Sequence, residues 1–494
     1  MDAIWTLGNQ DTPRYAPLNA DADADVAIIG AGITGLTTAL TLAEAGQKVI
    51  VLEAREVGGG VTGGSTGNLY STLASGQASI RKKWGDEVSR DVIRARSEAV
   101  DVIEALIERF AIDCQFQRQP AYRVEPANDS KAGYDWDEEK AALADAGLDV
   151  EAADHPGLPF ATQGIKISDQ AQFNPLHYVQ GLATVASDLG VIIHEHSPVR
   201  NVDHKQGTVT TDTACVSARH VVYATHTPKG LNLLQAGMLV SREYAVSARL
   251  KSGHYPEGII WAMDPFHSLR SYRQGNEQHV IVIGEKHKTG EQKGDHYRHL
   301  QEYLQTHFDV EAFTSQWSAQ QYSSPDGLPY IGRLHGQDTV YLATGFAADG
   351  LTWGTLAAMI ISDQVLGRDN PWQARFDARR ITPGKSATQY TKENAHVARH
   401  MFKDYLSTEK LKEADEVAPG QARVAKVDGE ELAIHRTEDG QLKVLSAVCP
   451  HMKCIVHWNN AESTWDCPCH GSRFDCDGEV IEGPSYHPLA RRIR

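Results

Sequence analysis

The stretch "DVAIIGAGITGLTTALTLAEAGQKVIVLEA", residues 25–54, decides the fold of the first part of the chain. An apolar β-rich run, apolar side chains at helical spacing and a second apolar run predict a strand, a helix and a strand. Gly30 would allow a tight turn, Gly32 would let the backbone approach a pyrophosphate, and Gly35 would let the helix pack closely on the strand. Glu53 ends the second strand, where a carboxylate can accept hydrogen bonds from ribose hydroxyls. The stretch therefore predicts a dinucleotide-binding unit.

The segments that follow indicate which dinucleotide is bound. "AREVGGGVTGGSTGNLYS", residues 54–71, is too long for a simple connection, so its backbone could lie along a cofactor. This run and four later blocks, at 173–199, 220–228, 323–332 and 340–367, resemble the D-amino-acid oxidase and glycine oxidase superfamily of FAD enzymes, in the same order. The resemblance spans most of residues 22–370 and implies FAD as the cofactor. It also implies that Gly345 lies near the flavin ring and that a helix beginning near Thr352 points its N-terminus at the ring.

The residues expected to contact FAD come from these matching blocks. They are Gly30, Gly32, Ile33, Thr34, Gly35, Glu53, Ala54, Arg55, Gly60, Thr62, Ser65, Thr66, Gly67, Asn68, Val199, Ala224, Thr225, Gly345, Gly350, Leu351 and Thr352.

Two stretches between the blocks do not match the cofactor pattern. Residues 82–112 have apolar side chains on one face of a predicted helix, and residues 240–318 contain alternating segments that predict an antiparallel sheet. In the resembled superfamily such insertions form the substrate domain.

The candidates for lining a substrate pocket are Tyr70, Tyr244, Trp261, Arg270, Tyr272 and Arg273. Each could equally be a packed aromatic or a surface ion pair. Either Arg270 or Arg273 would suit a carboxylate substrate, and the sequence names no catalytic residue.

Cysteine and histidine gather near the end of the chain, in "AVCPHMKC" (447–454) and "DCPCHGSRFDCDGEV" (466–480). Each loop supplies one cysteine and one histidine at close spacing, Cys449-x-His451 in the first and Cys467-x-x-His470 in the second. Structural zinc is one interpretation, because thiolates and imidazoles suit it, but common zinc modules pair cysteine with cysteine and histidine with histidine. Structural thiols are another. The mixed order, together with "EGPSYHPL" (482–489), resembles the Rieske [2Fe-2S] family, in which two thiolates hold one iron and two imidazoles hold the other.

The Rieske resemblance assigns roles to single residues. The inner iron would be bound by Cys449 and Cys467, and the outer, solvent-facing iron by His451 and His470. It also implies a disulfide between Cys454 and Cys469, although a cytosolic chain usually keeps its thiols reduced. Ser472 would donate a hydrogen bond to a bridging sulfide. Phe474 stands where high-potential members carry tyrosine, which predicts a middling reduction potential.

The amino-acid composition disfavours some classes of binding partner. The chain has 64 acidic and 48 basic residues, a formal charge of -16, which disfavours nucleic acid and anionic membrane surfaces. No apolar run approaches the roughly 20 residues that span a bilayer, and the first residues lack the features of a signal peptide. We therefore expect a cytoplasmic protein without membrane insertion.

The expected fold class is an α/β Rossmann-like FAD-binding domain with an antiparallel α+β substrate domain, followed by a C-terminal all-β Rieske domain. The flavoenzyme would occupy residues 1–384, with a discontinuous FAD part at about 22–80, 163–230 and 320–384 and a substrate part at about 81–162 and 231–319. A linker helix would follow at 385–410. Asp-Gly turns at 428 and 439 predict hairpins of a small barrel at 411–494.

Nearly the full chain resembles a bacterial group of Rieske-tailed FAD-dependent oxidoreductases. The resemblance implies oxidation of an amine or amino-acid-like substrate by hydride transfer to FAD, with electrons passed singly through the cluster to an acceptor protein.

Two alternatives stay open: a non-catalytic redox relay or sensor, and an oxygenase or demethylase component fed by the cluster. The latter would need an iron held by two histidines and a carboxylate, and no such grouping is evident in the sequence. A nicotinamide-dependent reductase would need a second G-x-G-x-x-G motif, which the sequence lacks.

Overall fold

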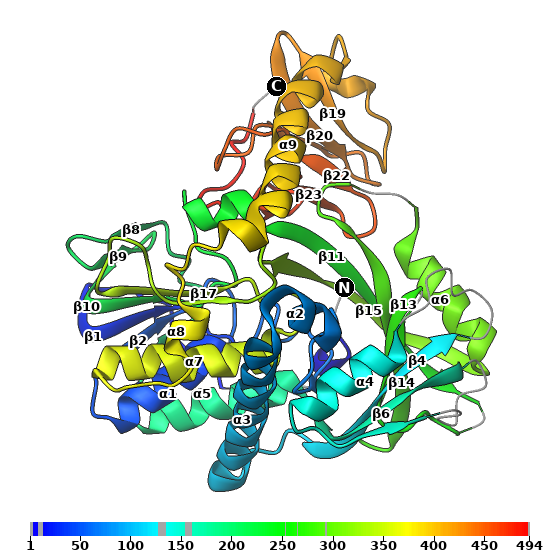
Figure 1. Cartoon of the computed structure of the whole chain (residues 1–494). Coiled ribbons are helices and arrows are strands. Elements are labelled where there is room, and N and C mark those ends of the chain that lie inside the picture. The colour runs from blue at the N-terminus through cyan, green and yellow to red at the C-terminus, as the bar shows by residue number, and fades with distance from the viewer. Residues whose placement is uncertain are drawn as a thin grey trace.

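The computed structural model describes residues 3–7, 13–126, 135–153, 161–251, 253–263, 265–291 and 294–492. Figure 1 shows a broad body made of two large sheets with their helices, and a smaller β-rich module that stands on top of it. The C-terminus lies in the upper module, and the labelled N-terminal end lies at the centre of the body.

The first sheet has eight strands, and its central strands β10, β1, β2 and β7 are parallel. In spatial order it contains β16 (Tyr330–Arg333), β17 (Val340–Thr344), β10 (Cys215–Tyr223), β1 (Ala22–Ile29), β2 (Val49–Leu52) and β7 (Ile192–His194), with β8 (Asn201–Asp203) and β9 (Thr208–Thr210) attached through β10. The buried residues 26–29 of β1 and 49–52 of β2 are all apolar, as expected for parallel strands covered on both faces.

Helices cover one face of this sheet (Figure 1). They are α1 (Ile33–Glu44), α5 (Pro175–Asp188) and α7 (Gly350–Leu366). A Cβ atom at Gly35 would lie 1.9 Å from the carbonyl oxygen of Gly30, so only glycine lets α1 begin this close to β1. The predicted strand–helix–strand unit is therefore confirmed as β1, α1 and β2.

The second sheet has nine strands and is largely antiparallel. Its order is β15 (Val310–Ser323), β11 (Leu239–Leu250), β14 (Glu277–Lys288), β13 (Phe266–Gln274), β12 (Ile259–Met263), β4 (Gln117–Pro126), β6 (Ala161–Gln172) and β3 (Asn68–Leu69), with β5 (Val150–Ala152) on β6. The parallel pair β12 and β4 joins the two inserted segments into one sheet. Because β6 belongs here, the predicted boundary near residue 163 is one strand early.

Four further helices belong to this part of the body. They are α2 (Gln77–Trp84), α3 (Asp86–Phe110), α4 (Trp136–Asp145) and α6 (His296–His307). The single helix expected at 82–112 is divided at Gly85, where φ is +90°, so α2 and α3 have separate axes.

The upper module follows α8 (Gln373–Phe376) and α9 (Pro383–Ser407), the helix predicted at 385–410. It contains two four-stranded sheets: β18 (Glu409–Lys410), β19 (Ala422–Val427), β20 (Glu430–Arg436) and β21 (Leu442–Ser446); and β22 (His457–Asn459), β23 (Thr464–Asp466), β24 (Arg473–Phe474) and β25 (Val480–Glu482). Val397 and Met401 of α9 pack on the core of the module, so α9 is more than a tether. None of the helices within the described ranges is both long and apolar enough to cross a bilayer.

Candidate cofactor sites and their junction

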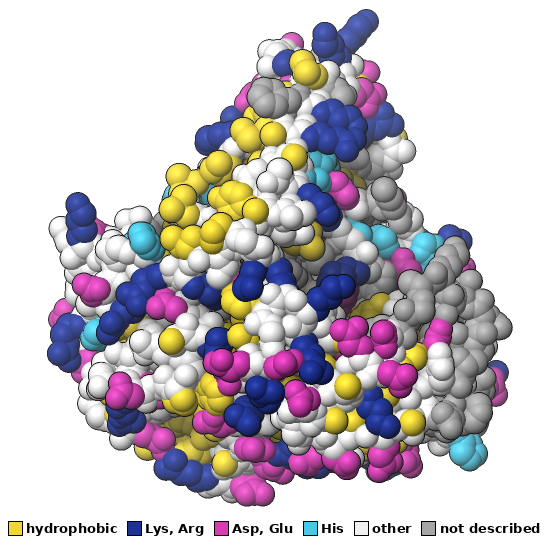
Figure 2. Space-filling view, viewed as in Figure 1, with side chains coloured by type: hydrophobic (Ala, Val, Ile, Leu, Met, Phe, Trp, Pro, Cys, Tyr) yellow, Lys and Arg dark blue, Asp and Glu magenta, His cyan; other side chains and the backbone are white. Residues whose placement is uncertain are grey.

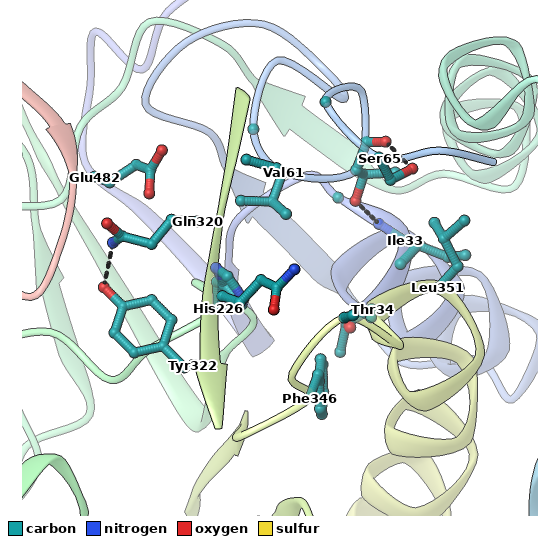
Figure 3. Close-up of a pocket in the computed structure, with 18 of the residues that line it drawn as sticks. Ile33, Thr34, Val61, Ser65, His226, Gln320, Tyr322, Phe346, Leu351 and Glu482 are labelled. Carbon is teal, nitrogen blue, oxygen red and sulfur yellow. Dashed lines mark hydrogen bonds between the residues drawn. The ribbon is translucent and has the colours of Figure 1, made fainter. Parts of the chain in front are cut away.

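A cavity lies where the parallel sheet, the antiparallel sheet and the upper module meet. Its walls come from the glycine-rich turns after β1 and β2, from β11 and β15, and from Ile481, Glu482 and Gly483 of the upper module. Figure 3 shows Gln320, Tyr322 and Glu482 on one side of it, and the helix starts at Ile33 and Leu351 on the other. All three parts of the chain therefore contribute to one cavity.

The cavity collects most of the residues predicted to contact FAD. All of them line it except Gly35, Gly67, Gly345 and Thr352. Gly35 lies behind the first turn against Gly30, and the Thr352 hydroxyl donates to the carbonyl oxygen of Tyr70, so both support the wall from outside.

The backbone and the charged side chains of the cavity wall both suit a bound dinucleotide. The first residues of α1 and α7 line it, and the N-terminal end of a helix favours negatively charged groups such as a pyrophosphate. Glu53 accepts the backbone N–H groups of Ala31 at 2.8 Å and Arg55 at 2.9 Å, and each carboxylate oxygen retains a lone pair for a ribose hydroxyl. Lys229, which the sequence did not single out, also lines the cavity, and burial lowers its pKa to about 8.

Three of the six predicted substrate residues line the cavity: Tyr70, Tyr244 and Trp261. Arg270, Tyr272 and Arg273 are absent from the cavity wall that the described residues form. The Arg270 guanidinium is buried and donates to the carbonyl oxygens of Thr66 at 2.8 Å and Phe173 at 3.1 Å, while Arg273 is exposed. Neither arginine is placed to bind a substrate carboxylate, because Arg270 is already used to hold two loops together.

A carboxylate stands in the cavity wall instead. Glu243 on β11 is 7% exposed, and its Oε2 accepts a hydrogen bond from Gln321 Nε2 at 2.6 Å. Burial raises the pKa of Glu243, although the Lys286 ammonium, 3.8 Å away, and the Gln321 hydrogen bond oppose this. The sequence contains no signal for Glu243, because its strand mixes polar and apolar residues. A charged residue in such a strand is as well explained by an exposed position on the surface as by a position in the cavity wall.

The two Cys/His loops of the upper module meet. The Cys449 and Cys467 side chains are 1% and 2% exposed, and the rings of His451 and His470 lie 5.0 Å apart between centroids. The pKa of Cys449 is lowered, chiefly by a hydrogen bond from the Cys467 thiol and further by donors of the same loop and Ser472. A disulfide joins Cys454 to Cys469 and ties the two loops together.

The two histidine rings also have the form expected of iron ligands. Each Nδ1 is buried and has no hydrogen-bond partner among the described residues. His451 Nε2 lies 3.2 Å from the carbonyl oxygen of Gly230 and 3.1 Å from Gln235 Oε1, both acceptors, so Nε2 carries the proton and Nδ1 carries a free lone pair. Burial lowers the pKa of His470 to about 4, which keeps it neutral. Two thiols and two unpartnered imidazole nitrogens fit a [2Fe-2S] cluster.

The expectation that this histidine face is turned to solvent is wrong. His470 is only 7% exposed, and His451 is half-buried against Gly230 and Gln235 of the body. The sequence of the loops could not reveal this, because the covering residues precede them by more than two hundred positions.

Two side chains of β15 join the cavity to these loops. Gln320 Nε2 donates to the carbonyl oxygen of Gly471 at 2.8 Å and to Tyr322 Oη at 2.8 Å, and Tyr322 Oη donates to the carbonyl oxygen of Gly483 at 3.0 Å. Figure 3 shows the Gln320–Tyr322 bond facing the cavity. The two candidate cofactor sites therefore share one wall.

Buried charges cross the same junction. Arg242 of β11, 1% exposed, lies 2.6 Å from Glu462 and 3.5 Å from Glu482 of the upper module. Arg473 also contacts both glutamates, at 2.6 and 3.0 Å, and lies 2.9 Å from Asp466. Although burial opposes it, the two arginines lower the pKa of Glu482, so the carboxylate is charged in the junction.

The structure also forms groupings that were not evident in the sequence. Glu285, His296 and His299 approach one another, and so do Glu291, His396 and His400, with the candidate ligand atoms of each set within 4.8 Å of one another. Both sets contain two histidines and a carboxylate, drawn from separate segments of the chain.

Comparison with known proteins identifies the class. The model of the family "FAD dependent oxidoreductase" matches residues 25–364, and the model of the Rieske [2Fe-2S] domain matches residues 407–491. The chain belongs to the FAD-dependent oxidoreductase family and carries a C-terminal Rieske domain, so its cofactors are FAD and a [2Fe-2S] cluster.

Individual relatives support the same architecture. The protein YhfW of Bacillus subtilis (strain 168), named as a Rieske 2Fe-2S iron-sulfur protein, is 31% identical over 499 residues, which cover 99% of this chain and 97% of that protein. Gamma-glutamylputrescine oxidoreductase of Escherichia coli (strain K12) is 25% identical and covers 74% of this chain and 88% of its own. The solved structure of glycine oxidase from Geobacillus kaustophilus has a TM-score of 0.58 at 18% identity, covers 73% of this chain and all of its own, and shows the shared fold.

Proposed function

We propose that this oxidoreductase oxidises a small amine and delivers the electrons singly to an acceptor protein. FAD would take up a hydride from the substrate, and the cluster, held by Cys449, Cys467, His451 and His470, would carry single electrons. The shared wall of Gln320 and Tyr322, which contacts both candidate sites, is the observation that carries this proposal.

Glu243 supports an amine as the substrate. A buried carboxylate in a cavity attracts a cationic nitrogen and repels a substrate carboxylate. The aromatic walls Tyr70 and Trp261, packed edge to face at 4.6 Å between centroids, would cover an apolar stem and exclude water. One relative is named for a substrate derived from an amine, gamma-glutamylputrescine, which agrees with this substrate class.

A patch of exposed hydrophobic side chains supports a protein as the acceptor. Leu231 and Leu233 are 76% and 83% exposed and lie within the segment 230–235, whose Gly230 and Gln235 contact His451. Met452, which is 38% exposed, follows His451 in the chain. Figure 2 shows hydrophobic side chains gathered on the flank where the upper module meets the body. An acceptor docked on these residues would lie next to the one cluster-side histidine that is partly accessible.

The substitution Glu243→Gln tests the substrate class. Loss of a charged hydrogen bond costs about 1.5–3 kcal/mol, so kcat/KM for a responsive amine should fall by about 10- to 100-fold. Steady-state kinetics over a panel of amines and amino acids would measure this, and FAD and iron contents should stay unchanged. Glu277→Gln, at an exposed position of β14, is the matched control. Equal kinetics in the Glu243→Gln and Glu277→Gln variants would contradict an amine anchored at Glu243.

A further inference from the structure

Glu291, His396 and His400 form a cluster at the junction of all three parts of the chain. Glu291 follows β14 of the antiparallel sheet, and the two histidines lie one turn apart on α9. Glu291 Oε1 lies 3.6 Å from His396 Nδ1 and 3.4 Å from His400 Nε2. None of these residues lines the cofactor cavity that the described residues form.

The longer of these separations suits a shared metal rather than a direct hydrogen bond, and the shorter is a long hydrogen bond. A contact of 3.6 Å is too long for a hydrogen bond, and 3.4 Å is near the limit. Two ligands held at about 2.0–2.1 Å from one tetrahedral ion stand roughly 3.3 Å apart, close to what is observed. In the otherwise similar set around Glu285, His296 Nδ1 and His299 Nδ1 lie 3.0 and 2.9 Å from the carboxylate, so ordinary hydrogen bonds satisfy it.

The contact of His400 with Asp404 also suits a metal ligand. His400 Nδ1 lies 2.9 Å from Asp404 Oδ2, and a proton on Nδ1 would orient the ring and leave Nε2, which faces Glu291, for a metal.

We propose that Glu291, His396 and His400 bind one divalent transition-metal ion of the zinc class, which holds helix α9 against the antiparallel sheet. Glu291 is 38% exposed, which leaves a coordination position open to water. Two imidazoles and one carboxylate are ligands that zinc and ferrous iron both accept.

The site would also secure the Rieske domain. Asp404, which orients His400, accepts a second hydrogen bond from His457 Nε2 at 3.0 Å, and His457 Nδ1 donates to the carbonyl oxygen of Gly290 at 2.7 Å. Gly290 packs directly on Pro468, beside Cys467. The bound ion therefore fixes the helix and the loop that hold the cluster loops in place.

The test is metal analysis of the full-length protein with both cofactors, dialysed against a weak chelator and then titrated with zinc in a calorimeter. One zinc per chain should bind in addition to the two irons of the cluster. His396→Ala and Glu291→Gln should weaken zinc binding by at least about 10-fold, while the matched control His299→Ala, in the set around Glu285, should bind zinc as the wild type does. A third iron per chain that His396→Ala removes would support the same site with iron as its metal.

The shift in Tm on adding zinc provides a second test, and it can be measured on the wild-type protein itself, so that it does not depend on whether a variant folds. Zinc in excess should raise the Tm of the wild-type protein by a few degrees, and should raise the Tm of His299→Ala equally. Absence of both zinc binding and a third iron in the wild type, or equal loss of binding in His299→Ala and His396→Ala, would overturn the proposal.

Discussion

The turns at residues 30–68 and the loops at 449–472 both form candidate cofactor sites, but the first uses mainly backbone and the second uses side chains. The first region presents glycines, helix starts and backbone N–H groups to the cavity, with Glu53 as its one acidic side chain. The second offers four side chains as proposed ligands, the buried thiols of Cys449 and Cys467 and the imidazoles of His451 and His470. A site built from backbone depends little on any single side chain, whereas a site built from four ligands depends on each of them.

The largest expected effect follows from this contrast. His470→Ala removes one of four proposed ligands and should abolish the cluster, so that iron and acid-labile sulfide are lost while FAD is retained. Turnover with a one-electron acceptor protein should fall by at least about 100-fold, and bleaching of the flavin by substrate in a single anaerobic turnover should persist. Iron analysis and stopped-flow absorbance would measure both.

Glu53→Ala is the counterpart in the backbone-built region. It should weaken FAD retention without emptying the cavity and should leave the cluster intact, because helix starts and glycine turns remain. If Glu53→Ala removed FAD as completely as His470→Ala removes the cluster, the contrast between the two regions would be wrong.

The next effect concerns the junction between the regions. Arg242→Met removes one of the two arginines that form ion pairs with Glu462 and Glu482 among the described residues, and removing one partner of a buried ion pair costs about 3–5 kcal/mol. Denaturant unfolding followed by cluster absorbance should register this loss. Arg249→Met on the same strand, whose partners are more than half exposed, should cost less than about 1 kcal/mol. Similar losses in both variants would show that the junction charges do not hold the domains together.

The smallest effect is a pH dependence of the contact between α9 and the Rieske domain. Burial alone would lower the pKa of His457, but the hydrogen bond to Asp404 and its charge raise it above 6.5. The stabilisation is therefore complete below pH 6.5 and is lost as the pH rises through the pKa in the folded protein. The pKa of Asp404 is lowered from 3.8 by His400 and His457, despite burial, so its contribution is lost only in acid.

Comparing wild type with His457→Gln in a chelating buffer would measure this dependence. The difference in Tm should be greatest near pH 6 and should shrink toward pH 8.5, corresponding to less than about 1 kcal/mol because His457 is 31% exposed. A difference that grew with rising pH would show that His457 is neutral in this contact.

The sequence was sufficient where function depends on residues close together in the chain. The spacing of Gly30, Gly32 and Gly35 predicts the turn and the close helix packing, because a missing Cβ acts on the adjacent backbone. The alternation of cysteine and histidine in two short loops likewise predicts the ligand chemistry, since ligand type and spacing are local properties.

The tertiary structure alone decided which distant residues meet. Sequence favoured Arg270 or Arg273 as the substrate anchor, but the fold uses Arg270 to hold two carbonyl groups and turns Glu243 to the cavity. It also covers His451 with Gly230 and Gln235, although the isolated loop pattern suggested exposure. These contacts depend on how strands and domains pack across separations of one hundred to more than two hundred residues, and no local pattern of side chains specifies that packing.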